Sequence, residues 1–84
     1  MSDRIADTAR RLLEAARDRG MWVTADVRIG EQDAADLLGW SSDSLKNARS
    51  EGRGPRWYRL GGAGHRVTYR LDDLAAWIES LAEG

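Results

Sequence analysis

Hydrophobic side chains recur along the first part of the chain at the spacing of an α-helix. In residues 2–19 they form a single stripe, which consists of Ile5, Ala9, Leu12, Leu13 and Ala16. Ser2 is a suitable cap for the start of such a helix, and Gly20 stands where helices commonly end. The pattern therefore predicts an amphipathic helix over residues 2–19.

The pattern then changes twice within twenty residues. Residues 21–29 alternate between apolar and polar side chains, which predicts a short extended segment or strand. The apolar spacing in residues 31–38 is again that of a helix, and Gly39 follows it directly. An extended segment and a second, shorter helix are therefore predicted before Trp40.

A third helix is predicted directly after this turn. Ser41 or Ser42 can cap its start, and it runs to about residue 51. Leu45 and Ala48 have the spacing of side chains that face a core. The other side chains are expected to point outward: Asp43, Ser44, Lys46, Asn47, Arg49 and Ser50.

Glycine and proline interrupt the chain after residue 51, and two strand-like runs follow. Residues 56–60 and 66–70 are rich in aromatic and β-branched side chains, and the segment 61–64 between them contains three glycines. Asp72 is a suitable cap for a last helix, whose apolar stripe includes Trp77. We therefore predict a fold that is mainly α with a small β-hairpin.

The composition limits the kinds of site that the chain can build. Its 84 residues suffice for one small domain, which buries somewhat over ~60% of its unfolded surface. Cysteine is absent and His65 is the single histidine, which excludes disulfides, thiolate zinc sites and sites with two imidazoles. No apolar run approaches the ~20 residues of a membrane span, and the N-terminus lacks the apolar core of a signal peptide. We expect a cytoplasmic protein.

The net charge of −1 hides a strong asymmetry along the chain. Residues 1–40 carry six arginines against eight acidic residues, residues 41–70 carry seven basic residues against two acidic ones, and residues 71–84 carry four acidic residues and no basic one. A basic middle between acidic flanks is typical of a surface that binds a polyanion. An ordinary solvated surface of ion pairs is the alternative.

Two short helices joined by a tight turn and followed by a basic hairpin are typical of a winged helix-turn-helix. The second helix of such a pair lies in the major groove of DNA, where Arg and Lys read guanine, Asn reads adenine and Ser reads either. A polar surface helix is the alternative, but serine, asparagine and aspartate are poor choices for a merely stable helix. The predicted recognition residues are Ser42, Ser44, Lys46, Asn47 and Arg49.

Residues 29–78 resemble the excisionase and AlpA-like group of MerR-type winged helices. The shared features are an acidic helix ending in Leu-Leu-Gly, a serine-capped recognition helix, a Gly-x-Gly-Pro break, an aromatic strand ending in Leu-Gly, and Asp-Leu followed by a tryptophan. The pattern begins only near residue 29. The matching positions are Ala34, Ala35, Leu38, Gly39, Ser42, Gly52, Gly54, Pro55, Leu60, Gly61, Tyr69, Asp73, Leu74 and Trp77.

This resemblance implies a small DNA-binding protein of a phage or mobile element. Members of the group act as recombination directionality factors (excisionases), as transcription regulators or as DNA-recognition parts of phage terminases. The partners implied are double-stranded DNA, an integrase and further copies of the chain on DNA. The hairpin would be a wing that touches the neighbouring backbone or minor groove, and the residues assigned to the wing and its flanks are Arg53, Arg56, Arg59, His65 and Arg66.

No nucleophile, general base or cofactor motif is recognisable, so we expect no enzymatic activity, no cofactor and no metal. The alternatives to an excisionase or related regulator are a DNA-recognition subunit for phage DNA packaging and a protein-interaction module that has lost DNA binding. Residues 29–84 are expected to form the winged helix-turn-helix domain, with residues 1–28 packed on it. The first helix must bury its apolar stripe, either beside Trp77 and Ile78, which we favour, or against a neighbouring molecule.

Overall fold

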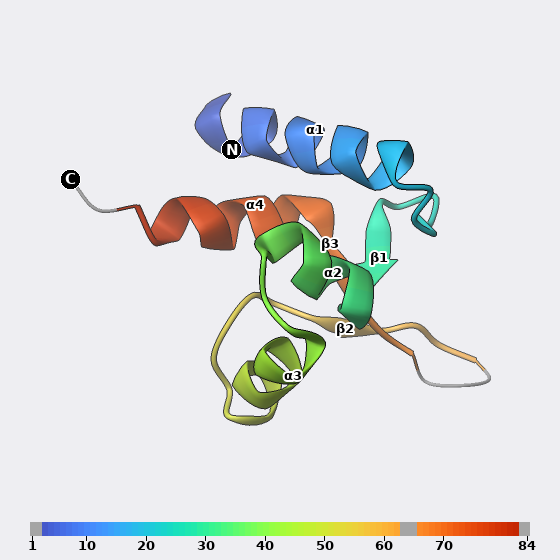
Figure 1. Ribbon diagram of the computed structural model, residues 1–84, viewed down its shortest axis with the longest axis vertical. Coiled ribbons are helices and arrows are strands. Elements are labelled where there is room, and N and C mark those ends of the chain that lie inside the picture. The colour runs from blue at the N-terminus through green and yellow to red at the C-terminus, as the bar shows by residue number, and fades with distance from the viewer. Residues whose placement is uncertain (1–2, 63–65, 83–84) are drawn as a thin grey trace.

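The computed structural model describes residues 3–62 and 66–82. The protein is mainly α with a small antiparallel sheet of three strands (Figure 1). The predicted hairpin contains shorter strands than expected, and a further strand joins it. The elements are α1 (Asp3–Asp18), β1 (Arg28–Gly30), α2 (Glu31–Leu38), α3 (Ser42–Ser50), β2 (Tyr58–Arg59), β3 (Val67–Arg70) and α4 (Leu71–Ser80).

The turn between α2 and α3 is built from local hydrogen bonds. Gly39 adopts a left-handed backbone conformation (φ 75°), which a side chain would strain. Its N–H donates to the carbonyl of Asp36, and the N–H of Trp40 donates to the carbonyl of Ala35 at 2.9 Å, an arrangement common at helix ends. Of the two candidate serines, Ser41 is the cap of α3, because its hydroxyl accepts the N–H of Ser44. The turn thus starts α3 within three residues of α2.

The start of the last helix differs from the prediction. Asp72 was expected to be the cap that precedes the helix, but α4 already begins at Leu71, and Arg70 is the residue before it. Leu71 is buried and its N–H donates to the carbonyl of Val27, so the helix begins where the chain enters the core. Asp72 lies in the first turn instead, where its carboxylate accepts the N–H of Asp73 and pairs with Arg70.

The alternation of residues 21–29 forms a strand only at its end. Before β1 the chain turns: the N–H of Val27 donates to the carbonyl of Thr24, and the Thr24 hydroxyl accepts the N–H of Arg28. Such local bonds from a threonine compete with an extended strand. The prediction of an extended segment over all of residues 21–29 is therefore wrong. β1 itself pairs with β3 in antiparallel register, with Ile29 opposite Tyr69, and gives the strand order β1-β3-β2.

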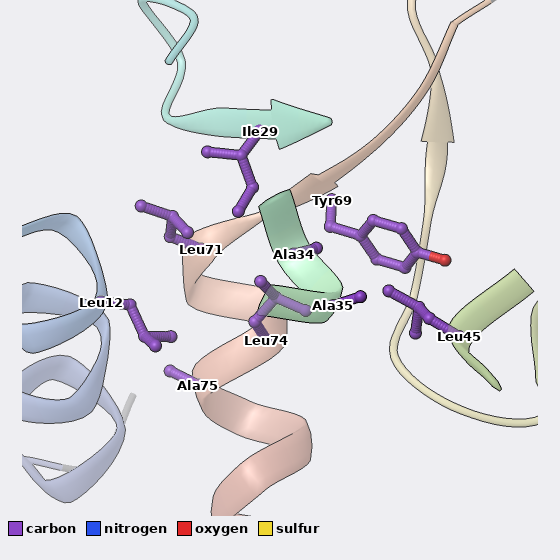
Figure 2. Packing of buried hydrophobic residues seen from close by; sticks show 9 residues of the cluster. All are labelled: Leu12, Ile29, Ala34, Ala35, Leu45, Tyr69, Leu71, Leu74 and Ala75. Atoms are coloured by element: carbon purple, nitrogen blue, oxygen red, sulfur yellow. The ribbon is translucent and has the colours of Figure 1, made fainter. Parts of the chain in front are cut away.

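The core draws side chains from α1 to α4 and from the sheet (Figure 2). Leu12 of α1 points toward α4, and Ile5, Ala9, Leu13 and Ile78 are partly buried against the core cluster. The apolar stripe of α1 therefore packs on the core of the same chain, where Leu12 and Ala16 are buried and the other three residues are partly buried. The buried cluster consists of Leu12, Ile29, Ala34, Ala35, Leu45, Tyr69, Leu71, Leu74 and Ala75.

Two tryptophans pack at the edge of this core. The rings of Trp40 and Trp77 meet edge to face, with their centroids 5.1 Å apart, which joins the α2–α3 turn to α4. α1 lies along one side of α4, while α3 and β2 lie on the other side (Figure 1). Within the described residues, no helix combines the length and the apolar character that crossing a membrane requires.

Candidate nucleic-acid interface

Helix α3 presents a polar face on the side of the protein away from α1. Leu45 and Ala48 hold it to the core, since both side chains are buried. Among the predicted recognition residues, four are exposed, and Asp43 and Ser50 beside them are exposed as well. These four recognition residues are Ser42, Ser44, Lys46 and Asn47.

Arg49, the fifth predicted recognition residue, does not point outward as expected. Its Nε donates to Oε2 of Glu31 at 2.7 Å and its Nη2 donates to Oε1 at 3.2 Å, a two-point ion pair. The two side chains are only 16% and 18% exposed. The hydroxyl of Tyr69 donates to the same carboxylate at 2.8 Å. Arg49 therefore connects α3 to the start of α2 and to β3.

This contact also sets the ionisation of Glu31. Partial burial raises the pKa of its carboxyl, but the hydrogen bonds from Arg49 and Tyr69, together with the charges of Arg49 and Lys46, more than offset the burial. The pKa of Glu31 consequently lies below its ordinary value, and the pKa of Arg49 lies above its own because the Glu31 carboxylate accepts its hydrogen bonds. Both groups are charged at neutral pH.

Arg56 and Arg59, predicted for the wing and its flanks, contact aromatic rings. The guanidinium carbon of Arg56 lies 5.4 Å from the ring centre of Tyr58, and that of Arg59 lies 5.4 Å from the ring centre of Trp57. The guanidinium of Arg49 lies over the same indole, also at 5.4 Å. Such cation–π contacts orient a guanidinium without cancelling its charge.

The two remaining arginines predicted for the wing and its flanks are Arg53 and Arg66. Arg53 pairs with Glu51, but both side chains are more than half exposed, so water screens this pair. Arg66 lies 4.1 Å from the ring centre of Trp22. Among the described residues, neither Lys46, Arg56 nor Arg66 forms an ion pair. The predicted contact of His65 lies outside the described residues.

Two hollows on the surface differ in charge. One of about 220 Å³ lies beside α3 and is lined by Gly52, Arg53, Gly54, Pro55, Arg56 and Trp57. Another, of about 350 Å³, is acidic and lies at the turn before α3, lined by Gln32, Asp33, Asp36, Trp40 and Ser42. No group of three or more potential metal ligands from His, Cys, Asp and Glu gathers in the part of the chain that the structure describes.

Sequence reasoning missed two residues that organise this surface. Glu31 had no assigned role, although its carboxylate accepts hydrogen bonds from Arg49 and Tyr69. Trp22 had no assigned place, although it lies against Arg66. Both contacts join residues far apart in the chain, so no local spacing could reveal them.

Comparison with protein-family models, with curated proteins and with solved structures found no match for this chain.

Proposed function

We propose that this chain is a winged helix-turn-helix protein that binds double-stranded DNA in a sequence-specific manner. The observation that carries the proposal is the state of the basic residues between positions 41 and 70. Lys46, Arg56 and Arg66 have no carboxylate partner among the described residues, and Arg56, Arg59 and Arg66 lie over aromatic rings. Positive charge that the protein itself leaves uncancelled is available to phosphates.

In this proposal α3 is the recognition helix. Its two buried residues fix it to the core, and its exposed side includes Lys46 and Asn47, which can donate to guanine and pair with adenine. Ser42 and Ser44, in its first turn, can donate to bases or phosphates. Arg49 supports the same helix from behind through Glu31, so we assign it to positioning α3 rather than to reading a base.

The hairpin β2–β3 is the wing in this proposal. Arg53, Arg56, Arg59 and Arg66 supply its phosphate contacts, which fix the position of the protein on the duplex without reading the sequence. Within this class, the resemblance of residues 29–78 supports a role as an excisionase or as a related regulator of a phage or mobile element. An integrase and further copies of the chain on the same DNA are the partners of that role.

A salt titration tests the proposal. Duplexes that bind the protein are first selected from a random library at low salt, and the affinity for an enriched duplex is then measured by fluorescence anisotropy at increasing salt. With about four to six basic side chains on phosphates, the slope of log K against log salt lies near −4 to −5. A scrambled duplex of equal length binds more weakly, with a similar slope.

Two outcomes contradict the proposal. One is the absence of binding to any duplex at low salt. The other is binding whose affinity hardly changes with salt, because phosphate contacts always release counterions. A protein-interaction module that has lost DNA binding would give the first outcome. Such a module has no need of basic side chains that lack a carboxylate partner among the described residues.

A further inference from the structure

Trp22 lies against Arg66, the residue before β3, although it belongs to the segment between α1 and β1. Its indole is 41% exposed, an unusual environment for so large an apolar side chain. The guanidinium carbon of Arg66 lies 4.1 Å from the centre of its ring, the shortest of the four cation–π distances in the described residues. Trp22 thus has a specific contact rather than a place in the core.

Gly30 borders the same guanidinium. A Cβ atom on this residue would lie 2.7 Å from Nη2 of Arg66, closer than nonbonded atoms approach each other, and 3.3 Å from its Nε, a tight contact. The backbone of Gly30 (φ −72°, ψ 165°) is ordinary extended geometry, so its conformation does not require glycine. What glycine supplies at this position is space for Arg66.

The same residue lies directly before the next helix. Gly30 is the residue that precedes α2, where Ser, Thr, Asp or Asn would accept a hydrogen bond from the first turn. The structure records no side-chain cap there. The residue before α2 is therefore a glycine whose missing Cβ leaves room for the guanidinium of Arg66.

The backbone on both sides of the contact is fixed by hydrogen bonds. Next to Trp22, the N–H of Met21 donates to the carbonyl of Ala16 at 2.9 Å, which ties the segment to the end of α1. On the hairpin, the carbonyl of Arg66 accepts the N–H of Leu60 at 2.8 Å. The ring and the guanidinium therefore meet because two anchored segments bring them together.

We propose that Trp22 and Gly30 are positioning residues that hold the guanidinium of Arg66 in place for a phosphate of the bound duplex. This inference rests on the proposed function and adds to the interface a residue outside the segment 29–78. An aromatic ring suits this task because it restricts the rotamers of Arg66 before binding and leaves its charge uncancelled. A carboxylate in the same place would neutralise that charge.

A double-mutant cycle on an enriched duplex tests the proposal. Arg66→Ala weakens binding about fivefold to tenfold at low salt, as expected for one lost charged contact. Trp22→Ala weakens it about threefold, the scale of an exposed cation–π contact, whereas Trp22→Phe retains most of the affinity. In the Arg66→Ala background, Trp22→Ala has no further effect. With Lys46→Ala, which lies on α3, the effect of Trp22→Ala is additive.

Gly30→Ala provides a second variant that folds. Only the tip of a flexible side chain has to move to admit the new methyl group, so the melting temperature is retained. The guanidinium is displaced, and DNA binding weakens about as much as in Trp22→Ala. In the free protein, the upfield ring-current shift of the Arg66 side-chain protons in NMR spectra disappears in both variants.

The outcomes separate this inference from the proposed function. If the wild type binds duplex DNA but the effects of Trp22→Ala and Arg66→Ala simply add, Trp22 does not act through Arg66, and the inference fails while the function stands. The same holds if Gly30→Ala binds DNA like the wild type. If the wild type binds no duplex, the function and the inference fail together.

Discussion

Three arginines of α1 and three in or beside the hairpin have different partners, whereas Arg70 of β3 pairs with Asp72. On α1, Arg10 pairs with Asp7 and Glu14, and Arg11 pairs with Asp7. The other paired side chains at this end of the protein are Arg4 with Glu79 and Arg19 with Asp36. On the hairpin and beside it, the guanidinium groups of Arg56, Arg59 and Arg66 lie over aromatic rings.

The difference separates two functions of the same side chain. An exposed ion pair adds little stability, but it cancels the field of the arginine at a distance. An aromatic ring orients the guanidinium but leaves its positive charge in place. A chain with a net charge of −1 can thus have a nearly neutral face at α1 and a basic face at α3 and the hairpin. Figure 1 places these two regions on opposite sides of α4.

The largest effect is expected on the neutral side, from Leu12→Ala. Leu12 is 9% exposed and is the α1 residue that points toward α4 in Figure 2. Its truncation removes buried methyl groups and leaves a cavity, so the free energy of unfolding falls by about 2–3 kcal/mol. For a domain of this size, the melting temperature then falls by roughly 10–20 °C. Calorimetry and urea denaturation measure both quantities.

The same variant tests whether the two regions act separately. At a temperature where Leu12→Ala is still folded, its affinity for an enriched duplex equals that of the wild type, because α1 supplies no phosphate contact in the proposed function. A loss of affinity that persists in fully folded protein would mean that α1 takes part in binding. In solution the protein is expected to be monomeric, since the stripe of α1 packs on the core of the same chain.

An intermediate effect is expected at Glu31, the carboxylate that pairs with an arginine of α3. Glu31→Gln removes the charge that faces Arg49 and lowers the free energy of unfolding by about 1–2 kcal/mol at pH 7. Because the pKa of Glu31 is lower in the folded protein than its ordinary value of 4.5, the ion pair stabilises the fold above that pH. This contribution is lost as the pH falls through the lowered pKa. Urea denaturation across this pH range measures the difference between wild type and variant, which shrinks toward acid pH.

Glu31→Gln is also expected to change stability and DNA affinity in opposite directions. Stability falls, whereas DNA affinity at low salt rises, because the charge of Arg49 is no longer cancelled. Glu51→Gln is the matched control: it also frees an arginine, Arg53, but from an exposed pair, so stability stays unchanged. A fall in DNA affinity for Glu31→Gln would instead mean that Arg49 places α3 so strictly that losing the pair disturbs the interface.

The helices were predictable because their signals are local. The apolar spacing of α1 and the Gly39 turn gave bounds within a residue of those observed, since both depend only on neighbours in the chain. The segment before β1 was not predictable in the same way. Its alternation resembles that of a strand, but the side chain of Thr24 bonds to the backbone and turns the chain before β1 can start.

The candidate interface was predictable in its composition but not in its pairings. The sequence alone identified the basic residues between positions 41 and 70. It could not show that Arg49 turns back to Glu31, 18 residues earlier, or that Arg66 meets Trp22. Ion pairs and ring contacts of this kind depend on how the elements pack. Only the fold therefore shows that Glu31 holds Arg49, whereas Arg56 and Arg66 have no carboxylate partner among the described residues.

The smallest effect, and the most direct test of the comparison, comes from removing one charge in each region. Arg56→Gln and Arg10→Gln each remove one charge from an exposed arginine, so they alter the net charge equally. Arg56 lies over Tyr58 and has no carboxylate partner among the described residues, whereas Arg10 faces Asp7 and Glu14. If the ring leaves the charge available to DNA, Arg56→Gln makes the salt slope shallower by about one. Arg10→Gln leaves the slope and the affinity unchanged, as measured by anisotropy in parallel titrations. Equal changes in both variants would show that net charge alone governs binding, and the distinction between the two faces would then be wrong.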